Sequence, residues 1–488
     1  MNILPKLEEV KAFAEEGNYK TVPVSCEILS DFTTPIETMR VLKNISSHCY
    51  MLESAQQNER WGRYSFLGFD PKLSVSCVNG ELKAGSLKIQ TDDPSGYLRQ
   101  ILADYRSPRF DYLPPFAGGF VGYFSYDYLG YREPSVRCPA EDTECFKDVD
   151  LMLFDKVIAF DHVKQKIVLI VTISLDDPET EYRRAGVELK QLARLLRTGK
   201  KKEEPAGHLT GEVKQLFDKK RYCEMAEKAK TYIREGEIFQ IVLSNRLSAE
   251  FEGSLLNTYR VLRTMNPSPY MFYFSGTDVE VAGASPETLV KLENGILHTF
   301  PLAGTRPRGR TEAEDQRLEM ELLSDEKEIA EHNMLVDLGR NDLGKISEFG
   351  SVHVEKLHSI EKFSHVMHIG STVSGKIREG FDGFDAIEAV LPAGTLSGAP
   401  KIRACQLIGE LESNKKGIYG GAIGYIDFTG NMDTCIAIRI AYKKNGTVFV
   451  RSGAGIVADS VPEREYEECI NKAKAVVKAL KTAGEETI

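Results

Sequence analysis

The chain has 488 residues, of which 42% are hydrophobic and 27% are charged, as in ordinary water-soluble globular proteins. Its 62 Lys and Arg are outnumbered by 72 Asp and Glu, giving a net charge of −10, so the basic excess of a nucleic-acid-binding protein is missing. No run of 18 apolar residues predicts a membrane span, and the start, MNILPKLEEVKAFAEEG, lacks the order of a secretory signal. The nine cysteines form no CxxC pair, which favours reduced thiols in a cytoplasmic protein.

The first half of the chain is predicted to be rich in strands, after a short amphipathic helix at its start. Residues 116–131 are rich in glycine and aromatic side chains, which suits a twisted sheet, and residues 149–173 predict one hairpin of two β-branched runs. Residues 197–212, RTGKKKEEPAGHLTGE, are charged, contain Pro and Gly and show no apolar periodicity. They predict a linker between an N-terminal region, 1–196, and a second region, 213–488.

The second region mixes helices and strands. Apolar spacing predicts a helix over 222–233, ended by Gly236, and then a strand over 238–247. Further strands are predicted at 270–274, 279–283, 288–292, 297–301, 421–427, 434–442 and 447–452, and helices at 312–336, 383–390, 400–412 and 462–482. Because strands often follow one another directly, we expect antiparallel pairing and an α+β fold, with large, mainly antiparallel sheets flanked by helices.

Two of the predicted helices carry glutamates three residues apart. Glu328 and Glu331 lie in one helix, and Glu465 and Glu468 lie in the other. Residues at this spacing share a helix face, so two such faces across a cleft would present four carboxylates, a donor set that suits Mg²⁺. Such pairs are also common on solvated helices, and Glu468 with Lys472 makes an ordinary i,i+4 ion pair, so the spacing leaves both interpretations open.

A series of glycine-punctuated motifs over residues 236–474 resembles the chorismate-utilising enzyme family. In chain order these are GEIFQIVLSNR, GASPETLVKL, PLAGTRPRG, DEKEIAEHNMLVDLGRNDLG, FSHVMHIGSTVSG, LPAGTLSGAPKIRA, GIYGGAIGYI, AIRIA and RSGAGIVADSVPEREYEE. The first half adds MLESAQ, RYSFLGFDP and GGFVGYFSYD. Within the family, these motifs are most similar to those of the anthranilate synthase large subunits.

The resemblance implies a site that binds chorismate and Mg²⁺. It implies metal contacts from Glu331 and Glu468, with Glu328 and Glu465 beside them. It gives Glu287 the role of protonating the departing C4 hydroxyl, and His368 a role in the loss of pyruvate. The implied catalytic residues are Gln240, Glu287, His368 and Thr395, and the implied substrate-binding residues are Ala303, Gly304, Thr305, Tyr419, Arg439, Gly453, Ala454, Gly455 and Lys472.

Two positions separate the branches of the family. Isochorismate and salicylate synthases have a lysine, which activates water, where this chain has Gln240. The 4-amino-4-deoxychorismate synthases have a lysine in PIKGT where this chain has Ala303 in PLAGT. Without these amines, the resemblance implies direct attack of ammonia on chorismate and formation of anthranilate, the first step toward tryptophan. Those two branches remain the alternatives, together with a catalytically silent tryptophan-binding protein on the same scaffold.

The source of ammonia is not evident in this sequence. Neither Cys405 nor Cys435 has the glycine-flanked turn and histidine partner of an amidotransferase nucleophile. The resemblance therefore implies a heteromer with a glutamine amidotransferase subunit. It also implies inhibition by tryptophan at a site remote from chorismate, formed by Leu52, Glu53, Ser54, Asn266, Pro267, Ser268, Tyr270 and Met271.

Overall fold

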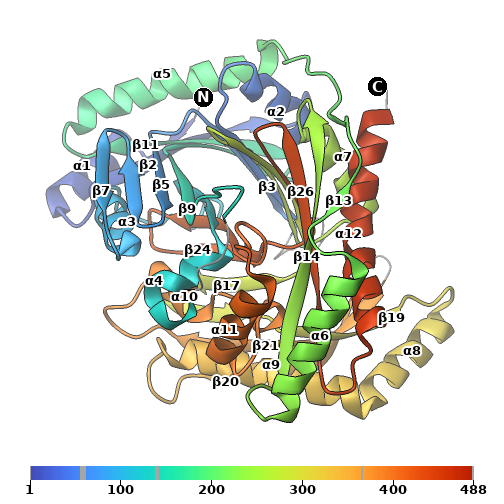
Figure 1. Ribbon diagram of the computed structural model, residues 1–488. Helices are drawn as coiled ribbons and strands as arrows, with labels where there is room; N and C mark the ends of the chain where they lie inside the picture. The colour runs from blue at the N-terminus through green and yellow to red at the C-terminus, as the bar shows by residue number, and fades with distance from the viewer. Residues whose placement is uncertain (1, 55–61, 138–141, 364–365, 486–488) are drawn as a thin grey trace.

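The computed structural model describes residues 2–54, 62–137, 142–363 and 366–485. Over these ranges the chain forms a pair of large antiparallel sheets that pack together, with helices around them (Figure 1). Cys138 and the motif residues Ala55, Gln56, Ser364 and His365 lie outside the described residues. Every pairing between named strands is antiparallel, which confirms the α+β prediction.

The first sheet has 14 strands among the described residues, and it carries one wall of the site described below. Its order is β1 (Ile3–Leu4), β2 (Thr21–Leu29), β11 (Lys166–Ser174), β10 (Lys156–Asp161), β4 (Tyr64–Phe69), β3 (Cys49–Glu53), β15 (Tyr270–Ser275), β16 (Val279–Ser285), β25 (Ile440–Lys444), β26 (Thr447–Ile456), β14 (Gln240–Glu252) and β12 (His208–Leu209), with β13 (Lys214–Gln215) and β22 (Gly398–Ala399) also paired to β14.

The second sheet has 12 strands in the same described ranges. Its order is β19 (Leu302–Pro307), β21 (Val366–Lys376), β18 (Ile296–Thr299), β17 (Thr288–Glu293), β24 (Met432–Ile436), β23 (Ala422–Asp427), β8 (Gly119–Phe124), β9 (Val149–Phe154), β5 (Leu73–Val78), β6 (Glu81–Ala84) and β7 (Leu87–Gln90), with β20 (His353–Lys362) paired to β21.

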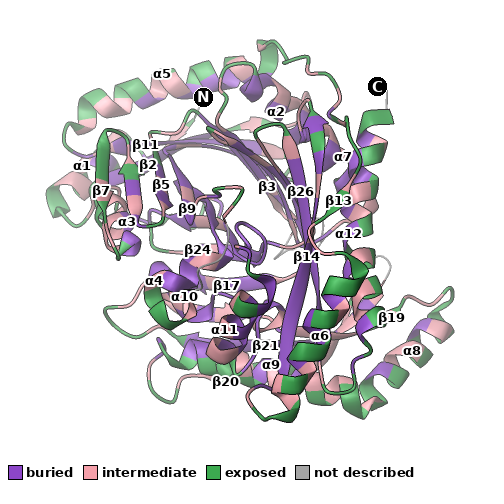
Figure 2. Ribbon diagram, viewed as in Figure 1, coloured by how far each residue is buried: buried purple, intermediate pink, exposed green. Residues whose placement is uncertain are grey.

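Helices cover the outer sides of the sheets, and their exposed faces contrast with the buried strands (Figure 2). They are α1 (Leu7–Glu16), α2 (Pro35–Lys43), α3 (Pro94–Ala103), α4 (Leu129–Arg132), α5 (Pro178–Thr198), α6 (Lys219–Arg234), α7 (Leu256–Met265), α8 (Glu312–Ser324), α9 (Glu326–Gly344), α10 (Gly383–Val390), α11 (Lys401–Glu412) and α12 (Pro462–Glu485), with 3₁₀ turns η1 (Tyr126–Tyr128), η2 (Pro134–Val136) and η3 (Gly394–Leu396). None of the helices in the described ranges is long and apolar enough to cross a membrane.

Helix α5 illustrates how the sequence places a helix on a sheet. The Asp177 side chain accepts a hydrogen bond from the Thr180 backbone N–H at 3.3 Å, and Pro178 stands at the first helical position. Leu189, Leu192 and Leu196 recur at helical spacing and are buried against the first sheet. Burial of each such leucine stabilises the fold by roughly 1.5–3 kcal/mol.

Aromatic and aliphatic side chains together fill the space between the sheets. Tyr50 and Phe272 of the first sheet pack with Tyr123 and Phe154 of the second in one buried cluster. The ring centroids of Tyr50 and Phe154 are 4.6 Å apart at 63°, in the edge-to-face arrangement that aromatic pairs prefer. This cluster holds the two sheets together beside the candidate site.

Three predicted elements are divided in the structure. The hairpin predicted over 149–173 is partly wrong, because β9 belongs to the second sheet and only β10 and β11 form a hairpin in the first. The helix predicted over 312–336 is interrupted at Asp325, whose side chain accepts from the Lys327 and Glu328 backbone N–H groups and starts α9. The strand predicted over 434–442 is interrupted at Arg439.

Both sheets draw strands from both sides of residues 197–212. In the first sheet β3, from the N-terminal region, pairs with β15, and in the second sheet β8 pairs with β23. The boundary drawn by the composition of residues 197–212 stays a prediction. The strand pairing nevertheless makes each sheet a joint product of the two regions.

Candidate active site

A cavity of about 800 Å³ lies between the sheets and the helices α9 and α12. It is lined by nearly every residue assigned above to catalysis, substrate or metal: Gln240, Glu287, Ala303, Gly304, Thr305, Glu328, Glu331, His368, Thr395, Tyr419, Arg439, Gly453, Gly455, Glu465, Glu468 and Lys472. Ala454 is the exception, because alternation along β26 turns its methyl group into the apolar cluster behind the strand. Residues from both sheets and from two helices thus converge on one cavity.

Glu287 lies between β16 and β17, at a point where strand pairing is irregular. The register of β17 against β24 shifts between Thr288 and Val290, and the Glu287 carbonyl accepts the Ile436 N–H at 3.0 Å. The Thr395 hydroxyl donates to Glu287 Oε1 at 3.1 Å. Burial raises the pKa of Glu287 to about 8, against the opposing effects of Thr395, Arg439 and Lys472. The carboxyl group is therefore largely protonated at neutral pH and can donate a proton.

Arg439 stands where the predicted strand is interrupted, between β24 and β25. Its φ is 53°, in the left-handed region that non-glycine residues rarely adopt. Burial lowers the pKa of Arg439, while the Glu287 carboxylate favours the charged form. The strained backbone turns a long cationic side chain out of the sheet and into the cavity wall.

Two glycines of β26 allow the strand to approach its neighbours closely. A Cβ at Gly453 would lie 2.8 Å from the Leu243 carbonyl oxygen and 3.2 Å from the Tyr419 hydroxyl. A Cβ at Gly455 would lie 2.9 Å from Nε2 of Gln240. Gln240 itself is 6% exposed, and its Oε1 has no hydrogen-bond partner among the described residues. A buried acceptor of this kind is costly unless a ligand or water meets it.

His368 lies on β21, beside the PLAGT segment of β19. Its Nδ1 is 2.8 Å from the Gly304 carbonyl oxygen and 3.1 Å from the Thr305 hydroxyl. A carbonyl can only accept, so Nδ1 carries the proton and Nε2 is left with the lone pair. Burial lowers the pKa of His368, which keeps the ring neutral and able to accept a proton at Nε2.

The four glutamates line the same cavity from α9 and α12, and two of them are engaged with basic side chains. Glu328 Oε1 lies 3.5 Å from Arg306 Nη1, and Glu468 Oε1 lies 2.7 Å from Lys472 Nζ. Burial, and then repulsion by Glu328, raise the pKa of Glu331. Among the described residues, no group of three or more His, Cys, Asp or Glu side chains is close enough to hold a metal ion. The carboxylates face one space without converging on a point.

The two arginines of PLAGTRPRG bind the protein's own carboxylates. Arg306 contacts Asp325 at 2.8 Å and Glu321 at 3.1 Å, while Arg308 makes a forked pair with Asp315. They tie β19 to α8 and α9 and so fix the wall that contains Ala303. Sequence reasoning did not single out four other charged residues that line the cavity, Lys327, Arg451, Asp459 and Arg464, although all lie within the quoted motifs.

A second, smaller cavity lies where β3 and β15 pair. It has a volume of about 120 Å³, and Leu52, Glu53, Ser54, Tyr270 and Met271 are among its lining residues. Met271 is paired with Glu53 across the strands, so the two predicted segments of the tryptophan site are neighbours. Asn266, Pro267 and Ser268 precede β15 and do not belong to this lining.

The Glu53 carboxylate is held by other side chains of the protein. It accepts from the Tyr259 hydroxyl at 2.6 Å, the Ser65 hydroxyl at 2.8 Å and the Arg263 guanidinium at 3.0 Å. These contacts fix Glu53 at the edge of the smaller cavity. Its carboxylate is therefore pre-positioned for any further contact with a ligand.

Comparison with known proteins places this architecture. The model of the family described as chorismate binding enzyme matches residues 7–478. The chain belongs to the chorismate-binding enzyme family. One curated relative, anthranilate synthase component 1 of Acetivibrio thermocellus, is 46% identical to this chain over 99% of both chains. Another, anthranilate synthase component 1 of Bacillus subtilis, is 40% identical over 97% of this chain and 95% of its own length.

Solved structures agree with the family assignment. Anthranilate synthase component I from Streptococcus pneumoniae matches with a TM-score of 0.78 and 39% identity, over 92% of this chorismate-binding enzyme and 98% of that chain. The menaquinone-specific isochorismate synthase from Escherichia coli matches with a TM-score of 0.69 and 20% identity, over 97% of this chain and 98% of its own. The second likeness shows a shared fold.

Proposed function

We propose that this chain is the large subunit of an anthranilate synthase. Ammonia attacks C2 of chorismate as the C4 hydroxyl leaves, giving 2-amino-2-deoxyisochorismate, and loss of pyruvate then gives anthranilate. The observation that carries the proposal is the methyl group of Ala303 in the cavity wall, where the 4-amino-4-deoxychorismate synthases resembled by this sequence carry a lysine. The names of relatives that are 40–46% identical over nearly the whole chain support it.

Departure of the C4 hydroxyl requires a proton, and Glu287 is the proposed donor. Its raised pKa keeps the proton on the carboxyl group at neutral pH, and the Thr395 hydroxyl fixes the orientation of Oε1. Donation leaves a carboxylate, which Arg439 and Lys472 stabilise electrostatically. The leaving group departs as water.

Gln240 is proposed to orient the nucleophile. Its Oε1, which has no partner in the part of the chain that the structure describes, can accept an N–H of ammonia and leave the nitrogen lone pair directed at the ring. A glutamine amide is too weak a base to activate water, which disfavours the isochorismate and salicylate alternatives. Ala303 is partly buried in the wall and has no amine, so it cannot form the covalent lysine adduct of the 4-amino-4-deoxychorismate alternative.

Arg439, Tyr419 and Lys472 are the proposed carboxylate-binding groups. A guanidinium suits two-point contact with a carboxylate, and the backbone N–H groups near Gly455 add donors at close range. In the second step Nε2 of His368 would take the proton from C2 while the C3–O bond to the enolpyruvyl group breaks. The ring becomes aromatic, and pyruvate is released.

The residues present fit a hard cation. Glu331 and Glu468 would hold Mg²⁺, with Glu328 and Glu465 beside them, because carboxylate oxygens are the donors that this cation prefers. Burial first, and then repulsion by the neighbouring glutamates, raise the pKa values of Glu331 and Glu465, and a bound cation would relieve both effects. When bound, the cation would neutralise substrate charge and polarise the ring. Arg306 and Lys472 balance two of these carboxylates in this structure.

A separate glutamine amidotransferase subunit is the proposed source of ammonia, because Cys405 and Cys435 are both buried and lack the accessible setting that an amidotransferase nucleophile needs. Purified chain with chorismate, Mg²⁺ and ammonium at alkaline pH should release anthranilate, detected by its fluorescence. Glutamine should serve only after the amidotransferase subunit is added. Production of anthranilate from glutamine by the single chain would refute the need for a separate amidotransferase subunit. Formation of 4-amino-4-deoxychorismate, isochorismate or salicylate in place of anthranilate would refute the assignment as an anthranilate synthase.

Tryptophan is proposed as an inhibitor that binds the smaller cavity between β3 and β15. Support comes from the pairing of Glu53 with Met271 and from the fixed carboxylate of Glu53, which suits an ammonium group. The cavity joins strands of the N-terminal and second regions. A ligand there would bias how the two regions pack.

A further inference from the structure

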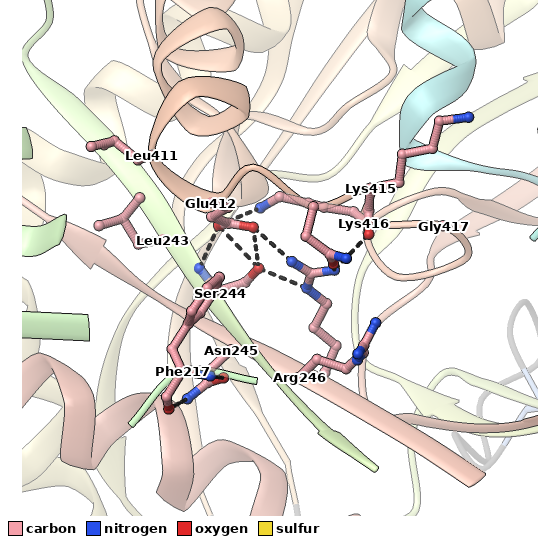
Figure 3. Close-up of polar contacts among 12 residues, drawn as sticks. Phe217, Leu243, Ser244, Asn245, Arg246, Leu411, Glu412, Lys415, Lys416 and Gly417 are labelled. Atoms are coloured by element: carbon pink, nitrogen blue, oxygen red, sulfur yellow. Dashed lines mark hydrogen bonds and ion pairs between the residues drawn. The ribbon is translucent and has the colours of Figure 1, made fainter. Parts of the chain in front are cut away.

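A buried cluster of charge stands directly behind the proposed substrate site. Glu412 ends α11 and Lys416 follows in the loop, and Figure 3 shows their side chains close together. Arg451 belongs to β26, and none of the three residues is more than 3% exposed. Burying charges is costly unless each one is paired and hydrogen-bonded. Among these three residues there are one carboxylate and two cations, so one positive charge is in excess within the cluster. A further carboxyl group, that of Asp127, accepts the Gly417 backbone N–H at 2.8 Å and interacts with Lys415 and Arg451.

Arg451 and Glu412 are fully engaged. Arg451 donates to Glu412 Oε2 at 2.7 Å, to the Ser244 hydroxyl at 2.8 Å and to the Lys415 carbonyl at 2.9 Å. Glu412 also accepts the Ser244 backbone N–H at 2.7 Å. These bonds join α11 to the paired strands β14 and β26, a structural role that explains both residues.

Lys416 is held less tightly than Arg451 in this arrangement. Its Nζ forms an ion pair with Glu412 Oε1 at 3.3 Å, without the geometry of a hydrogen bond to any described residue. The ammonium lies 4.9 Å from the centre of the Tyr126 ring and 5.9 Å from that of Tyr419. Burial and Arg451 lower the pKa of Lys416, while Glu412 and Cys405 favour its charged form.

The neighbouring Lys415 does not share this position. It pairs with Asp142 at 3.4 Å and Asp148 at 3.9 Å, on the far side of the loop from the cluster. Tyr419, by contrast, is near both: its ring centre is 5.9 Å from Lys416 Nζ, and it lines the main cavity together with Arg451 and Gly453. The excess charge is therefore one aromatic ring away from the space where the substrate's carboxylate is proposed to bind.

We propose that Lys416 is a positioning residue for the anionic substrate, acting through the ring of Tyr419. A cation against the ring draws electron density from the phenol, so its hydroxyl becomes a stronger hydrogen-bond donor to a carboxylate. The positive charge also offsets the repulsion that a dianion meets from the glutamates of the cavity. This role rests on the proposed function, because it needs chorismate or a similar dianion as the ligand.

The test compares Lys416→Met with Lys416→Arg in steady-state assays with ammonium and Mg²⁺. Lys416→Met should raise the KM for chorismate about tenfold and change kcat by less than about threefold, since the contact is made in the ground state and kept in the transition state. Lys416→Arg keeps the charge and should restore KM to within about threefold of the unmutated value. A control, Lys43→Met, removes another buried lysine that lies over a tyrosine ring, Tyr273, remote from the cavity, and should leave KM unchanged.

Two further variants separate an electrostatic role from a structural one. The double variant Tyr419→Phe with Lys416→Met should have a KM less than about twofold above that of Tyr419→Phe alone. The effects of two residues on KM are not additive when one acts through the other. Glu412→Gln increases the excess positive charge and should not raise KM, although it lowers the urea midpoint of unfolding. This variant also carries the test if Lys416→Met does not fold.

The inference would be overturned by an unchanged KM in folded Lys416→Met or by full additivity with Tyr419→Phe. It would also be overturned by a roughly tenfold rise in KM in folded Glu412→Gln. A lack of chorismate turnover by the unmutated chain would instead overturn the proposed function. The two failures are therefore distinguishable in one set of assays.

Discussion

At the scale of single residues, the positions that break local rules are those that line the main cavity. Arg439 has a left-handed backbone, Gln240 has a buried oxygen with no partner among the described residues, and Glu287 holds a proton near neutral pH. Each carries a cost in stability that ordinary packing does not explain. Their shared cavity indicates that binding and chemistry retain them.

We expect Glu287→Gln to lower kcat by roughly 10²–10⁴, because the amide cannot donate a proton to the leaving hydroxyl. With the concentration of free ammonia held constant, kcat/KM for chorismate in the unmutated enzyme should fall as pH rises through about 8, since only the protonated form of Glu287 is active. The residual kcat/KM of Glu287→Gln should not show this fall at alkaline pH. Rates measured over a pH series that spans the pKa of Glu287 on both sides test both points.

Glu388→Gln is the matched control for Glu287. Burial also raises the pKa of Glu388, which accepts a hydrogen bond from Tyr128 and does not line the cavity. Its pH profile should follow that of the unmutated enzyme. A Glu287→Gln enzyme that keeps the alkaline limb would show that another group is the acid.

At the scale of elements, interruptions in the predicted helix and strand build the site. Asp325 caps α9 and turns it away from α8, which brings Glu328 and Glu331 to the cavity opposite Glu465 and Glu468 of α12. One continuous helix through this stretch would carry its glutamates along a single axis. The cap therefore determines where a cation could bind.

We expect Glu331→Gln and Glu468→Gln each to abolish turnover, by a factor of at least about 10³, while leaving the fold intact, because each removes a carboxylate proposed to hold Mg²⁺. Glu467→Gln is the control: Glu467 is exposed on the same helix, pairs with Lys219 and does not line the cavity. Circular dichroism checks the fold. Mg²⁺-dependent activity within a few-fold of the unmutated value in either test variant would contradict the metal assignment.

Strand β19 makes a further prediction at this scale. The pairing of β19 with β21 shifts register between Ala303 and Arg306. Ala303 forms part of the cavity wall, where its methyl group occupies little space. We expect Ala303→Lys to block the site, with at least a roughly tenfold loss of anthranilate formation and no efficient formation of 4-amino-4-deoxychorismate. Ala303→Met separates bulk from charge and should block to a similar degree. Efficient conversion by Ala303→Lys would show that one residue sets the product.

At the scale of the whole molecule, pairing of β3 with β15 connects the N-terminal region to the strands that carry the site. β15 pairs in turn with β16, which leads directly into Glu287. A ligand in the smaller cavity would therefore act on the same sheet that holds the proposed acid. Coupling through a sheet of this kind is reciprocal, so each ligand must weaken the other by the same factor.

We expect Ser54→Phe to leave activity without tryptophan near normal and to raise the tryptophan concentration for half inhibition at least tenfold, or about 1.4 kcal/mol of lost binding. The phenyl ring that replaces the serine side chain would fill a cavity of only about 120 Å³. Ser54→Ala, which adds no bulk, should stay inhibited within a few-fold of the unmutated enzyme. Equal inhibition of Ser54→Phe, or no inhibition of the unmutated enzyme, would remove the site from consideration.

The sequence predicted local structure well where a single periodicity applied. The helix at α6 with Gly236 beyond its end, the strand β14, and the helices α10, α11 and α12 lie where spacing and capping residues placed them. It failed at 149–173, because strands buried on both faces read as one apolar run, which cannot reveal that the chain leaves one sheet for the other near Asp155.

The sequence by itself determined the family, through motifs whose glycines and charged residues recur in a fixed order, and nearly all the residues that it assigned to catalysis, substrate or metal line the main cavity. Only the tertiary structure decided how those residues face one another. Glu287 gains its raised pKa from burial by segments distant in the chain, and Lys416 becomes an excess charge only because α11 packs against β14 and β26. Solvation and electrostatic energies depend on distances in space, which no local pattern in a sequence contains.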